Sequence, residues 1–261
     1  MNASSAVSPG RVFLIGAGPG AADLLTLRAV RRLAEADVVL IDDLVNRELL
    51  GHVRPGVPVI EVGKRAGGRS TPQDFIDRLL LRYARQGKTV ARLKGGDPLV
   101  FGRGGEEAGF LAAHGIEVAV VPGISSGVAA PAALGIPVTH RDCTHGVTFI
   151  TAHTRLHREP DWAALAATGT TLVIYMGLSR LESICAGLLA GGLPSDMPVA
   201  VISRGTQPEQ REVIATLADI APLVRAAELP APALIVVGRV IEHAWLQQLP
   251  LVTADLPRQA A

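Results

Sequence analysis

The chain is 261 residues long, enough for two domains of ordinary size, and its formal net charge is +1 at pH 7. Because the charges nearly balance and form no runs of one sign, we expect neither nucleic acid nor a membrane as a partner. Hydrophobic residues make up 48% of the chain and aromatic residues only 3%, so the core must be aliphatic. Such a core is typical of parallel sheets that helices cover on both faces.

The first half of the chain alternates between predicted strands and predicted helices. Short apolar runs indicate strands at residues 11–15, 38–41, 57–62, 89–93 and 117–121. Apolar residues at helical spacing indicate helices at residues 26–36, 72–86 and 106–114. Alternation of this kind predicts parallel βαβ units, in which ligands bind at the carboxyl ends of the strands.

The same pattern continues after residue 122. Helices are expected at residues 125–134 and 179–190, strands at 148–151, 171–175, 198–203 and 233–237, and a partly helical segment at 215–226. The predicted fold class is therefore α/β, with two α/β lobes, mostly parallel sheets and an active-site cleft between the lobes. The expected boundaries are 11–122 for the N-terminal lobe and 123–246 for the C-terminal lobe, with flexible tails at 1–10 and 247–261.

The segment at residues 92–107, RLKGGDPLVFGRGGEE, is the most informative in the chain. It runs from a predicted strand through a glycine-rich loop into a predicted helix. Glycine leaves the backbone amides open to close approach by a ligand, and Pro98 disfavours a helical conformation at Asp97. These features favour a small-molecule site over the alternative, an ordinary strand-to-helix turn.

A second glycine loop, GAGPGA at residues 16–21, matches the dinucleotide-binding pattern G-x-G-x-x-A. Asp42 follows about twenty residues later, at the end of the second predicted strand, as that pattern requires. A nucleotide-binding oxidoreductase is therefore one alternative. Against it, Pro19 removes a backbone donor from the turn, and the sequence after Ala21 delays the next helix.

Taken together, the predicted strand ends resemble those of the tetrapyrrole methylases. The similar segments, in order, are LIGAGPG at 14–20, DLLTL at 23–27, ADVVLID at 36–42, VGKR at 62–65, RLKGGDPLVFGRGGEE at 92–107, VPGISS at 121–126, GIPVTHR at 135–141, VIYMG at 173–177 and RGTQ at 204–207. The resemblance covers nearly all of residues 11–241, and the segment at 92–107 is its most distinctive part.

The resemblance implies C-methylation of uroporphyrinogen III at C2 and C7, which gives precorrin-1 and then precorrin-2 for cobalamin or sirohaem. S-adenosyl-L-methionine would be the methyl donor and S-adenosyl-L-homocysteine the product, with no metal involved. It also implies a homodimer. The cofactor-binding residues implied by position are Pro19, Gly95, Gly96, Asp97, Val100, Ser125, Ser126, Met176 and Gly205.

The reaction needs an acid and a base, because the substrate loses and regains protons as its rings rearrange. By resemblance, Asp42 is the proton acceptor and Lys64 the proton donor. From the residues alone, Asp42 could equally be a surface acid or a helix cap beside Asp43. A solvated lysine is the alternative for Lys64.

Uroporphyrinogen III carries eight carboxylates, so basic side chains are expected around it. Arginine has the forked donor geometry that suits a carboxylate. The candidates are Arg65, Arg103, Arg141 and Arg204. Each could instead be an exposed arginine with ordinary surface partners.

Histidine and cysteine give little indication of a metal site. Four histidines fall between His140 and His157, but we expect structural or substrate-facing roles because no acid or cysteine completes a ligand set. Cys143 and Cys185 lack metal or redox spacing, which favours a reducing, cytoplasmic location.

Three classes of function stay open at this stage. Besides the methyltransferase and the oxidoreductase, the two lobes could form a non-catalytic module that binds a small anion. Within the family, another precorrin methyltransferase of the cobalamin pathway is the nearest alternative, and a diphthine synthase is a distant one.

Overall fold

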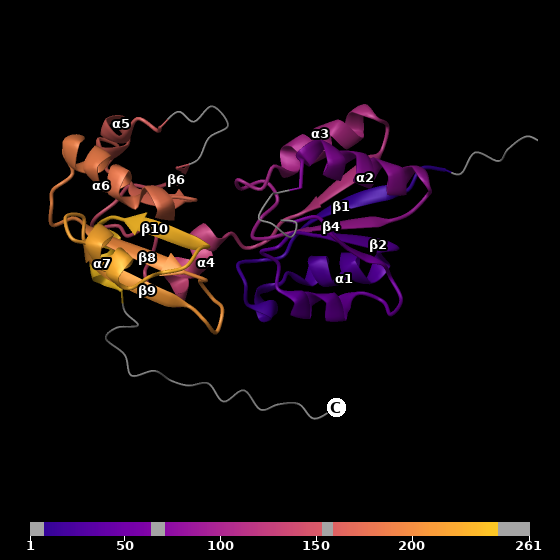
Figure 1. Ribbon diagram of the computed structural model, residues 1–261, viewed down its shortest axis with the longest axis horizontal. Coiled ribbons are helices and arrows are strands. Elements are labelled where there is room, and N and C mark those ends of the chain that lie inside the picture. The colour runs from indigo at the N-terminus through magenta and orange to yellow at the C-terminus, as the bar shows by residue number, and fades with distance from the viewer. Residues whose placement is uncertain (1–7, 64–70, 153–158, 245–261) are drawn as a thin grey trace, which may run out of the picture. The chain divides into compact units, whose positions relative to one another are not determined.

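The computed structural model describes residues 8–63, 71–152 and 159–244, and the chain divides into two compact units (Figure 1). The first unit comprises the chain up to Ala129 together with the segment Thr206–Glu209. The second comprises Ala130–Gly205 and the chain from Gln210 onward. The division therefore falls inside a helix, later in the chain than the boundary expected at residue 122, and it includes a return of the chain to the first unit.

A five-stranded parallel sheet forms the centre of the first unit, with strand order β3-β2-β4-β1-β5. Its strands are β1 (Arg11–Gly16), β2 (Val38–Ile41), β3 (Val59–Glu61), β4 (Val90–Lys94) and β5 (Glu117–Val121). Each of these strands overlaps a run predicted from the sequence. The parallel α/β architecture of this unit is thereby confirmed.

Helices cover both faces of this sheet (Figure 1). Helix α1 (Leu27–Glu35) packs on the face that carries Phe13 and Ile15 of β1. Helices α2 (Gln73–Arg85) and α3 (Gly104–Ala113) pack on the opposite face, against the alternate residues of the strands. Because side chains alternate across a strand, even-numbered positions of β2 and β4 point toward α2 and α3.

The sheet of the second unit is mixed, with strand order β6-β7-β10-β8-β9. Its strands are β6 (Val147–Thr151), β7 (Thr171–Tyr175), β8 (Pro198–Ser203), β9 (Arg211–Thr216) and β10 (Ala233–Val237). Only β6 and β7 pair in parallel, and the other three pairs are antiparallel. The expectation of mostly parallel sheets therefore holds for the first unit and not for this one. A short connection joins β8 to β9, and such a connection requires antiparallel pairing.

Helices α5 (Trp162–Ala166), α6 (Leu181–Ala190) and α7 (Ile220–Ala226) cover one face of the second sheet. The other face packs against Ala130 of α4 (Ser126–Ala133) and against the 3₁₀ helix η4 (Arg239–His243). Strand β9 and helix α5 were not predicted from the sequence. Residues 211–216 lie mainly before the segment taken as partly helical, and α5 is a single short turn.

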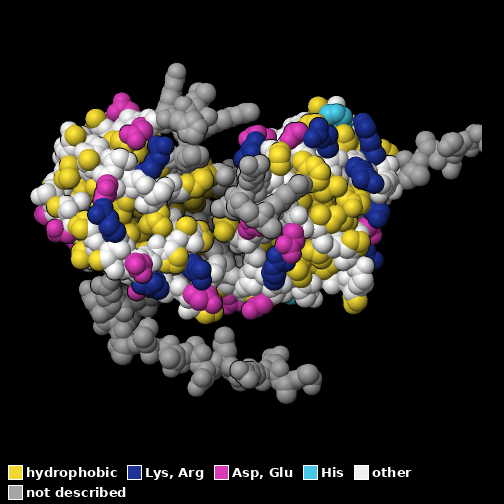
Figure 2. Space-filling view, viewed as in Figure 1, with side chains coloured by type: hydrophobic (Ala, Val, Ile, Leu, Met, Phe, Trp, Pro, Cys, Tyr) yellow, Lys and Arg dark blue, Asp and Glu magenta, His cyan; other side chains and the backbone are white. Residues whose placement is uncertain are grey.

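Among the residues that the structure describes, no helix is long and apolar enough to cross a membrane. Figure 2 shows basic and acidic side chains interspersed over the face that it draws. This distribution agrees with the balanced formal charge of the sequence.

Three loops at the carboxyl edge of the first sheet pack backbone against backbone. A Cβ added to Gly16 would lie 2.5 Å from Gly123 Cα, and one added to Gly123 would lie 2.2 Å from the carbonyl oxygen of Gly96. Real Cβ atoms essentially never approach a backbone atom so closely. The loops after β1, β4 and β5 can therefore meet only because these positions carry no side chain.

We expect the Gly123→Ala variant to lose about 1–3 kcal/mol of unfolding free energy, because its methyl group would force two backbones apart. Urea denaturation of the full chain measures this loss. Gly109→Ala is the matched control, since the added methyl at this exposed position of α3 meets nothing within 4 Å. Alanine there is expected to be neutral or stabilising. Equal stability of the two variants would contradict the packing argument.

Candidate active site

The loops after β1 and β4 are joined directly through their backbones. Gly18 and Gly96 form an isolated antiparallel bridge, in which Gly96 N donates to Gly18 O at 2.7 Å and Gly18 N donates to Gly96 O at 3.2 Å. The bridge places Pro19 beside the Gly95-Gly96 turn. Residues that the resemblance assigns to one cofactor site thus come together from two separate segments.

Asp97 fastens the loop after β4 to the loop after β5. Its Oδ2 accepts from Gly123 N at 3.0 Å, and its Oδ1 accepts from Leu99 N at 2.8 Å. A Cβ on Gly96 would lie 3.8 Å from Ser125 Cα, at ordinary contact distance. Both carboxylate oxygens of Asp97 therefore hold loop backbone, and the side chain fixes the path of the β4 loop through these amides.

Six of the nine residues assigned to the cofactor are thereby grouped at one edge of the first sheet: Pro19, Gly95, Gly96, Asp97, Ser125 and Ser126. Val100 lies in the same loop as Asp97, and its amide donates to the Asp97 carbonyl at 3.3 Å. These seven positions belong to the first unit.

Met176 and Gly205 belong to the second unit and lie at one edge of its sheet. Met176 follows the last residue of β7, and Gly205 follows β8 closely. Leu234, near the start of β10, pairs with Tyr175 on one side and Ile202 on the other. The ends of β7 and β8 therefore flank the start of the same strand, and Met176 is 51% exposed there.

Unusual backbone conformations concentrate in these loops. Among the described residues other than glycine, positive φ angles occur at Phe101, Arg103, Met176, Arg204, Thr206 and Glu228. All except Glu228 lie in the loops after β4, β7 and β8. Such conformations are costly for residues with a Cβ and cluster at functional sites.

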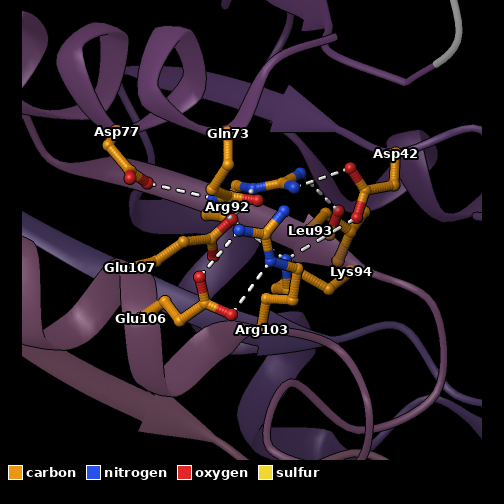
Figure 3. A network of polar contacts seen from close by, with 9 residues as sticks. All are labelled: Asp42, Gln73, Asp77, Arg92, Leu93, Lys94, Arg103, Glu106 and Glu107. Atoms are coloured by element: carbon orange, nitrogen blue, oxygen red, sulfur yellow. Dashed lines mark hydrogen bonds and ion pairs between the residues drawn. The ribbon is translucent and has the colours of Figure 1, made fainter. Parts of the chain in front are cut away.

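A network of buried charges lies behind the β4 loop (Figure 3). Arg92 donates from Nη2 to Asp42 Oδ1 at 2.6 Å and from Nε to Glu107 Oε1 at 3.1 Å. Lys94 Nζ donates to the same Glu107 oxygen at 3.0 Å and lies 3.8 Å from Asp42 Oδ2. Two cations from β4 thus meet one carboxylate from α3 and one from the end of β2.

The formal charges of this cluster cancel, which makes its burial tolerable. The side chains of Arg92, Lys94 and Glu107 are 2%, 4% and 0% exposed, so an unpaired charge among them would cost several kcal/mol. Burial, followed by the neighbouring Arg92 charge, lowers the pKa of Lys94 from its usual value, and Glu107 and Asp42 act in the opposite direction. Gln73 of α2 completes the cluster by donating to Glu107 Oε1 at 3.1 Å.

Asp42 is the member of the cluster that reaches the surface. Its side chain is 29% exposed, and Arg92 fixes one of its oxygens while the other has Lys94 nearby. The geometry presents a carboxylate of defined orientation at the carboxyl edge of the sheet. Lys64, the other expected catalytic residue, lies outside the described residues, as does Arg65.

Sequence reasoning missed Arg92 and Lys94 as partners of Asp42, and Glu107 as the second carboxylate that these cations share. A signal was available, because charges at alternate positions of a central parallel strand are rarely tolerated without buried partners. Their spacing of two predicts that both point to one face of β4, the face covered by α2 and α3.

The remaining arginine candidates lie in separate places. Arg103 is the N-cap residue directly before α3 and pairs with Glu106 on the surface at 2.7 Å. Arg141 is exposed in the turn before β6, and Arg204 is half-buried directly after β8. Arg103 lies at the side of the charge network, where its charge interacts with those of Asp77 and Glu107 (Figure 3), whereas Arg141 and Arg204 belong to the second unit.

The first glycine loop lacks the geometry of a dinucleotide site. Helix α1 does not follow the loop but begins at Leu27, after a 3₁₀ turn, and Thr26 caps it by accepting from Ala29 N at 3.2 Å. Amides in the loop are already used, since Gly18 N donates to Gly96 O and Ala21 N donates to Thr206 Oγ1 at 3.1 Å. A pyrophosphate would find neither these donors nor the adjacent helix start.

Comparison with known proteins agrees with this loop arrangement. The sequence-family model of the Tetrapyrrole (Corrin/Porphyrin) Methylases matches residues 11–221 of the chain. The chain belongs to the tetrapyrrole methylase family. Uroporphyrinogen-III C-methyltransferase of Pseudomonas aeruginosa is 52% identical over 93% of this chain and 98% of that protein. Siroheme synthase 2 of Aeromonas hydrophila is 51% identical over 89% of this chain, which spans only 49% of that protein.

Solved structures of tetrapyrrole methylases have the same fold. Uroporphyrin-III C-methyltransferase from Thermus thermophilus, complexed with S-adenosylhomocysteine, matches with a TM-score of 0.78 and 43% identity over 90% of this chain and 100% of that one. A cobalt precorrin-4 methyltransferase matches with a TM-score of 0.80 and 29% identity over 88% of this chain and 95% of that one. The expected α/β class and tetrapyrrole methylase fold are thus confirmed.

We expect Glu107→Gln to lower the unfolding free energy by about 3–5 kcal/mol, because it leaves two buried cations with one carboxylate between them. Glu106→Gln is the matched control one residue earlier, where an exposed ion pair contributes less than about 1 kcal/mol. Urea denaturation at neutral pH compares the two variants. A loss at Glu107 no larger than that at Glu106 would contradict a charge-balanced cluster.

Proposed function

We propose that this protein transfers methyl groups from S-adenosyl-L-methionine to C2 and C7 of uroporphyrinogen III, giving precorrin-2 through precorrin-1. The observation that carries the proposal is the 52% identity to a uroporphyrinogen-III C-methyltransferase over 98% of that protein's length. The loop geometry supports it, since the residues assigned to the cofactor within the first unit gather at one sheet edge.

The residues present fit a sulfonium nucleoside. The Gly95-Gly96 turn leaves room for a ligand to approach closely, because a Cβ on Gly96 would meet nothing closer than 3.8 Å, while the amide and carbonyl of Gly96 are bonded to Gly18. Ser125 and Ser126 stand beside this turn, and the exposed Met176 side chain offers an apolar, polarisable contact. We assign the cofactor to Pro19, Gly95, Gly96, Val100, Ser125, Ser126, Met176 and Gly205, with Asp97 holding the loop in shape. When bound, S-adenosyl-L-methionine supplies an electrophilic methyl group.

In this proposal, the chain contributes orientation and proton transfer. Holding a pyrrole carbon in line with the methyl group can supply about 7–11 kcal/mol of the barrier. Asp42 accepts the proton that the substrate releases, through Oδ2, because Arg92 already occupies Oδ1 at 2.6 Å. Lys64 is the proton donor. Arg92 and Lys94 act as positioning residues, since they hold the Asp42 carboxylate from behind.

Arginines would bind the carboxylate arms of the substrate. Arg65, Arg103, Arg141 and Arg204 remain our candidates for forked contacts with acetate and propionate groups. The backbone amide of Arg204 donates to Pro232 O at 3.0 Å. This hydrogen bond fixes the position from which the Arg204 side chain extends.

The decisive experiment incubates the full chain with uroporphyrinogen III and labelled S-adenosyl-L-methionine under anaerobic conditions. Mass spectrometry of the product counts the methyl groups, and two are expected. Equilibrium binding of S-adenosyl-L-homocysteine against NADPH tests the oxidoreductase alternative, for which only NADPH would bind. Failure of both methyl transfer and S-adenosyl-L-homocysteine binding would sink the proposal.

We expect Asp42→Asn to lower kcat by roughly 10²–10⁴-fold, as loss of a general base does, with little change in the affinity for S-adenosyl-L-homocysteine. Lys64→Met should behave in the same way. Asp43→Asn is the control, because it removes an exposed neighbouring carboxylate and leaves the Arg92 contact intact. Steady-state kinetics and calorimetry separate turnover from cofactor binding. Wild-type turnover in the Asp42 variant would remove this residue from the mechanism.

One alternative lies within the family. The TM-score of 0.80 to a cobalt precorrin-4 methyltransferase favours another precorrin methyltransferase as the second candidate. That enzyme class would leave uroporphyrinogen III unmodified and would methylate a later intermediate. The same labelled assay distinguishes the two, because it starts from the unmethylated macrocycle.

We further propose that the chain acts as a homodimer in the cytoplasm. The family resemblance supports the dimer, and the two free cysteines, Cys143 and Cys185, support a reducing compartment. Light scattering of the purified protein measures its molar mass and so tests the dimer.

A further inference from the structure

Three potential metal ligands from distant parts of the sequence meet in the second unit. They are His140, Cys143 and His243, and each offers a ligand atom within 4.8 Å of the other two. None of them belongs to the candidate active site described above. The sequence did not indicate this cluster, because His243 lies about a hundred residues after the other two.

A tight turn after α4 brings the first two ligands together. The carbonyl oxygen of His140 accepts from Cys143 N at 3.2 Å and from Thr144 N at 3.0 Å. This helical turn puts residues three apart on the same side, as in the short ligand pairs of zinc sites. The thiol of Cys143 is half-buried against the core cluster beneath the sheet.

The third ligand comes from the end of the 3₁₀ helix η4. Val240 and Ile241 anchor η4 in the same core cluster, with exposed fractions of 1% and 6%. Its last residue, His243, stacks on His140 with ring centroids 3.9 Å apart and an interplanar angle of 11°. Two separately anchored segments therefore bring the three side chains together.

The donor set suits a borderline-soft divalent ion. A thiolate and two imidazoles are common zinc ligands, with bonds of about 2.0–2.3 Å that place tetrahedral donors about 3.5 Å apart. Because an imidazole nitrogen binds a metal in the plane of its ring, the ion would separate the stacked rings of His140 and His243 and turn one nitrogen of each toward it. The side chain of His140 is 31% exposed, so an ion can enter from solvent. Asp142 Oδ2 lies 3.7 Å from His140 Nδ1, close enough to interact with this imidazole when it is protonated.

We propose that His140, Cys143 and His243 form a zinc-binding site with an open fourth position. The ion ties the turn that precedes β6 to η4 and so stabilises one face of the second sheet. None of the three ligands is among the residues assigned to the cofactor or to proton transfer. The effect of the ion is that of any ligand which binds the folded chain and not the unfolded one, namely a rise in melting temperature.

The test is titration of the chelator-treated full chain, without an affinity tag, with Co²⁺ and then Zn²⁺. We expect one equivalent of Co²⁺ to bind, with the thiolate-to-cobalt charge-transfer band and the visible bands of a four-coordinate ion. One equivalent of Zn²⁺ should displace the cobalt and raise the melting temperature. Absence of saturable binding, or a spectrum without the thiolate band, would overturn the proposal.

Variants locate the site. Cys143→Ser should abolish the charge-transfer band and weaken Zn²⁺ binding at least tenfold, and His243→Asn should weaken it independently. His145→Asn, at an exposed histidine two residues from Cys143, and Cys185→Ala, at the other cysteine, should retain the wild-type spectrum. Melting of each metal-free variant checks that it folds. Wild-type affinity in both the Cys143 and His243 variants, or loss of the band in the Cys185 variant, would place the ion elsewhere and refute the assignment.

Discussion

The buried pairing of Arg92 with Glu107 is the interaction on which the first unit depends. It places a cation inside a central parallel strand, where a charge is tolerated only if an opposite charge is brought to it. Helix α3 must therefore dock so that its Glu107 reaches β4, and the β4 loop that precedes α3 is confined to one path. The same guanidinium extends to Asp42, so the position of the proposed base follows from the packing of the core.

This arrangement links stability to chemistry in one set of side chains. Lys94 and Gln73 are bonded to the Glu107 oxygen that Arg92 uses, while the second oxygen, Oε2, has no partner among the described atoms. Single substitutions in this cluster are expected to be destabilising, because removing any one charge leaves another buried charge unpaired. The surface pair of Arg103 and Glu106, one helical position away, carries no such constraint.

Local sequence pattern was enough to predict most of the secondary structure. The parallel strands of the first unit are continuous aliphatic runs, and the helices between them have a clear apolar side, so both signals are strong. Pairing in the second sheet could not be read in this way, since the direction of β10 between β7 and β8 is set by contacts between distant residues. Strand β9 also escaped, because its residues are only partly buried and show no clear alternation.

Sequence reasoning picked out loops that the fold brings together where a glycine or proline marked them, and it missed side chains that meet across the sequence; the cofactor assignment itself stays a prediction. The Gly95-Gly96 turn and the serines after β5 were recognised by resemblance, and the backbone bridge between Gly18 and Gly96 explains why they belong together. The partners of Asp42, by contrast, come from β4 and are shared with Glu107 of α3, and only the folded chain shows these side chains together. The His140, Cys143 and His243 cluster escaped for the same reason.

The return of Thr206–Glu209 to the first unit has a consequence for how the protein is made. Thr206 Oγ1 accepts a hydrogen bond from the Ala21 amide, and the Gln207 side chain packs over Gly20. The first glycine loop therefore lacks these contacts until most of the polypeptide has left the ribosome. During synthesis the first sheet can thus fold early, whereas the loop around Pro19 gains its last contacts only after β8 and the segment Thr206–Glu209 have been made. A gene fragment that stops after α4 would encode the whole first sheet but not the segment Thr206–Glu209 that packs on the loop after β1.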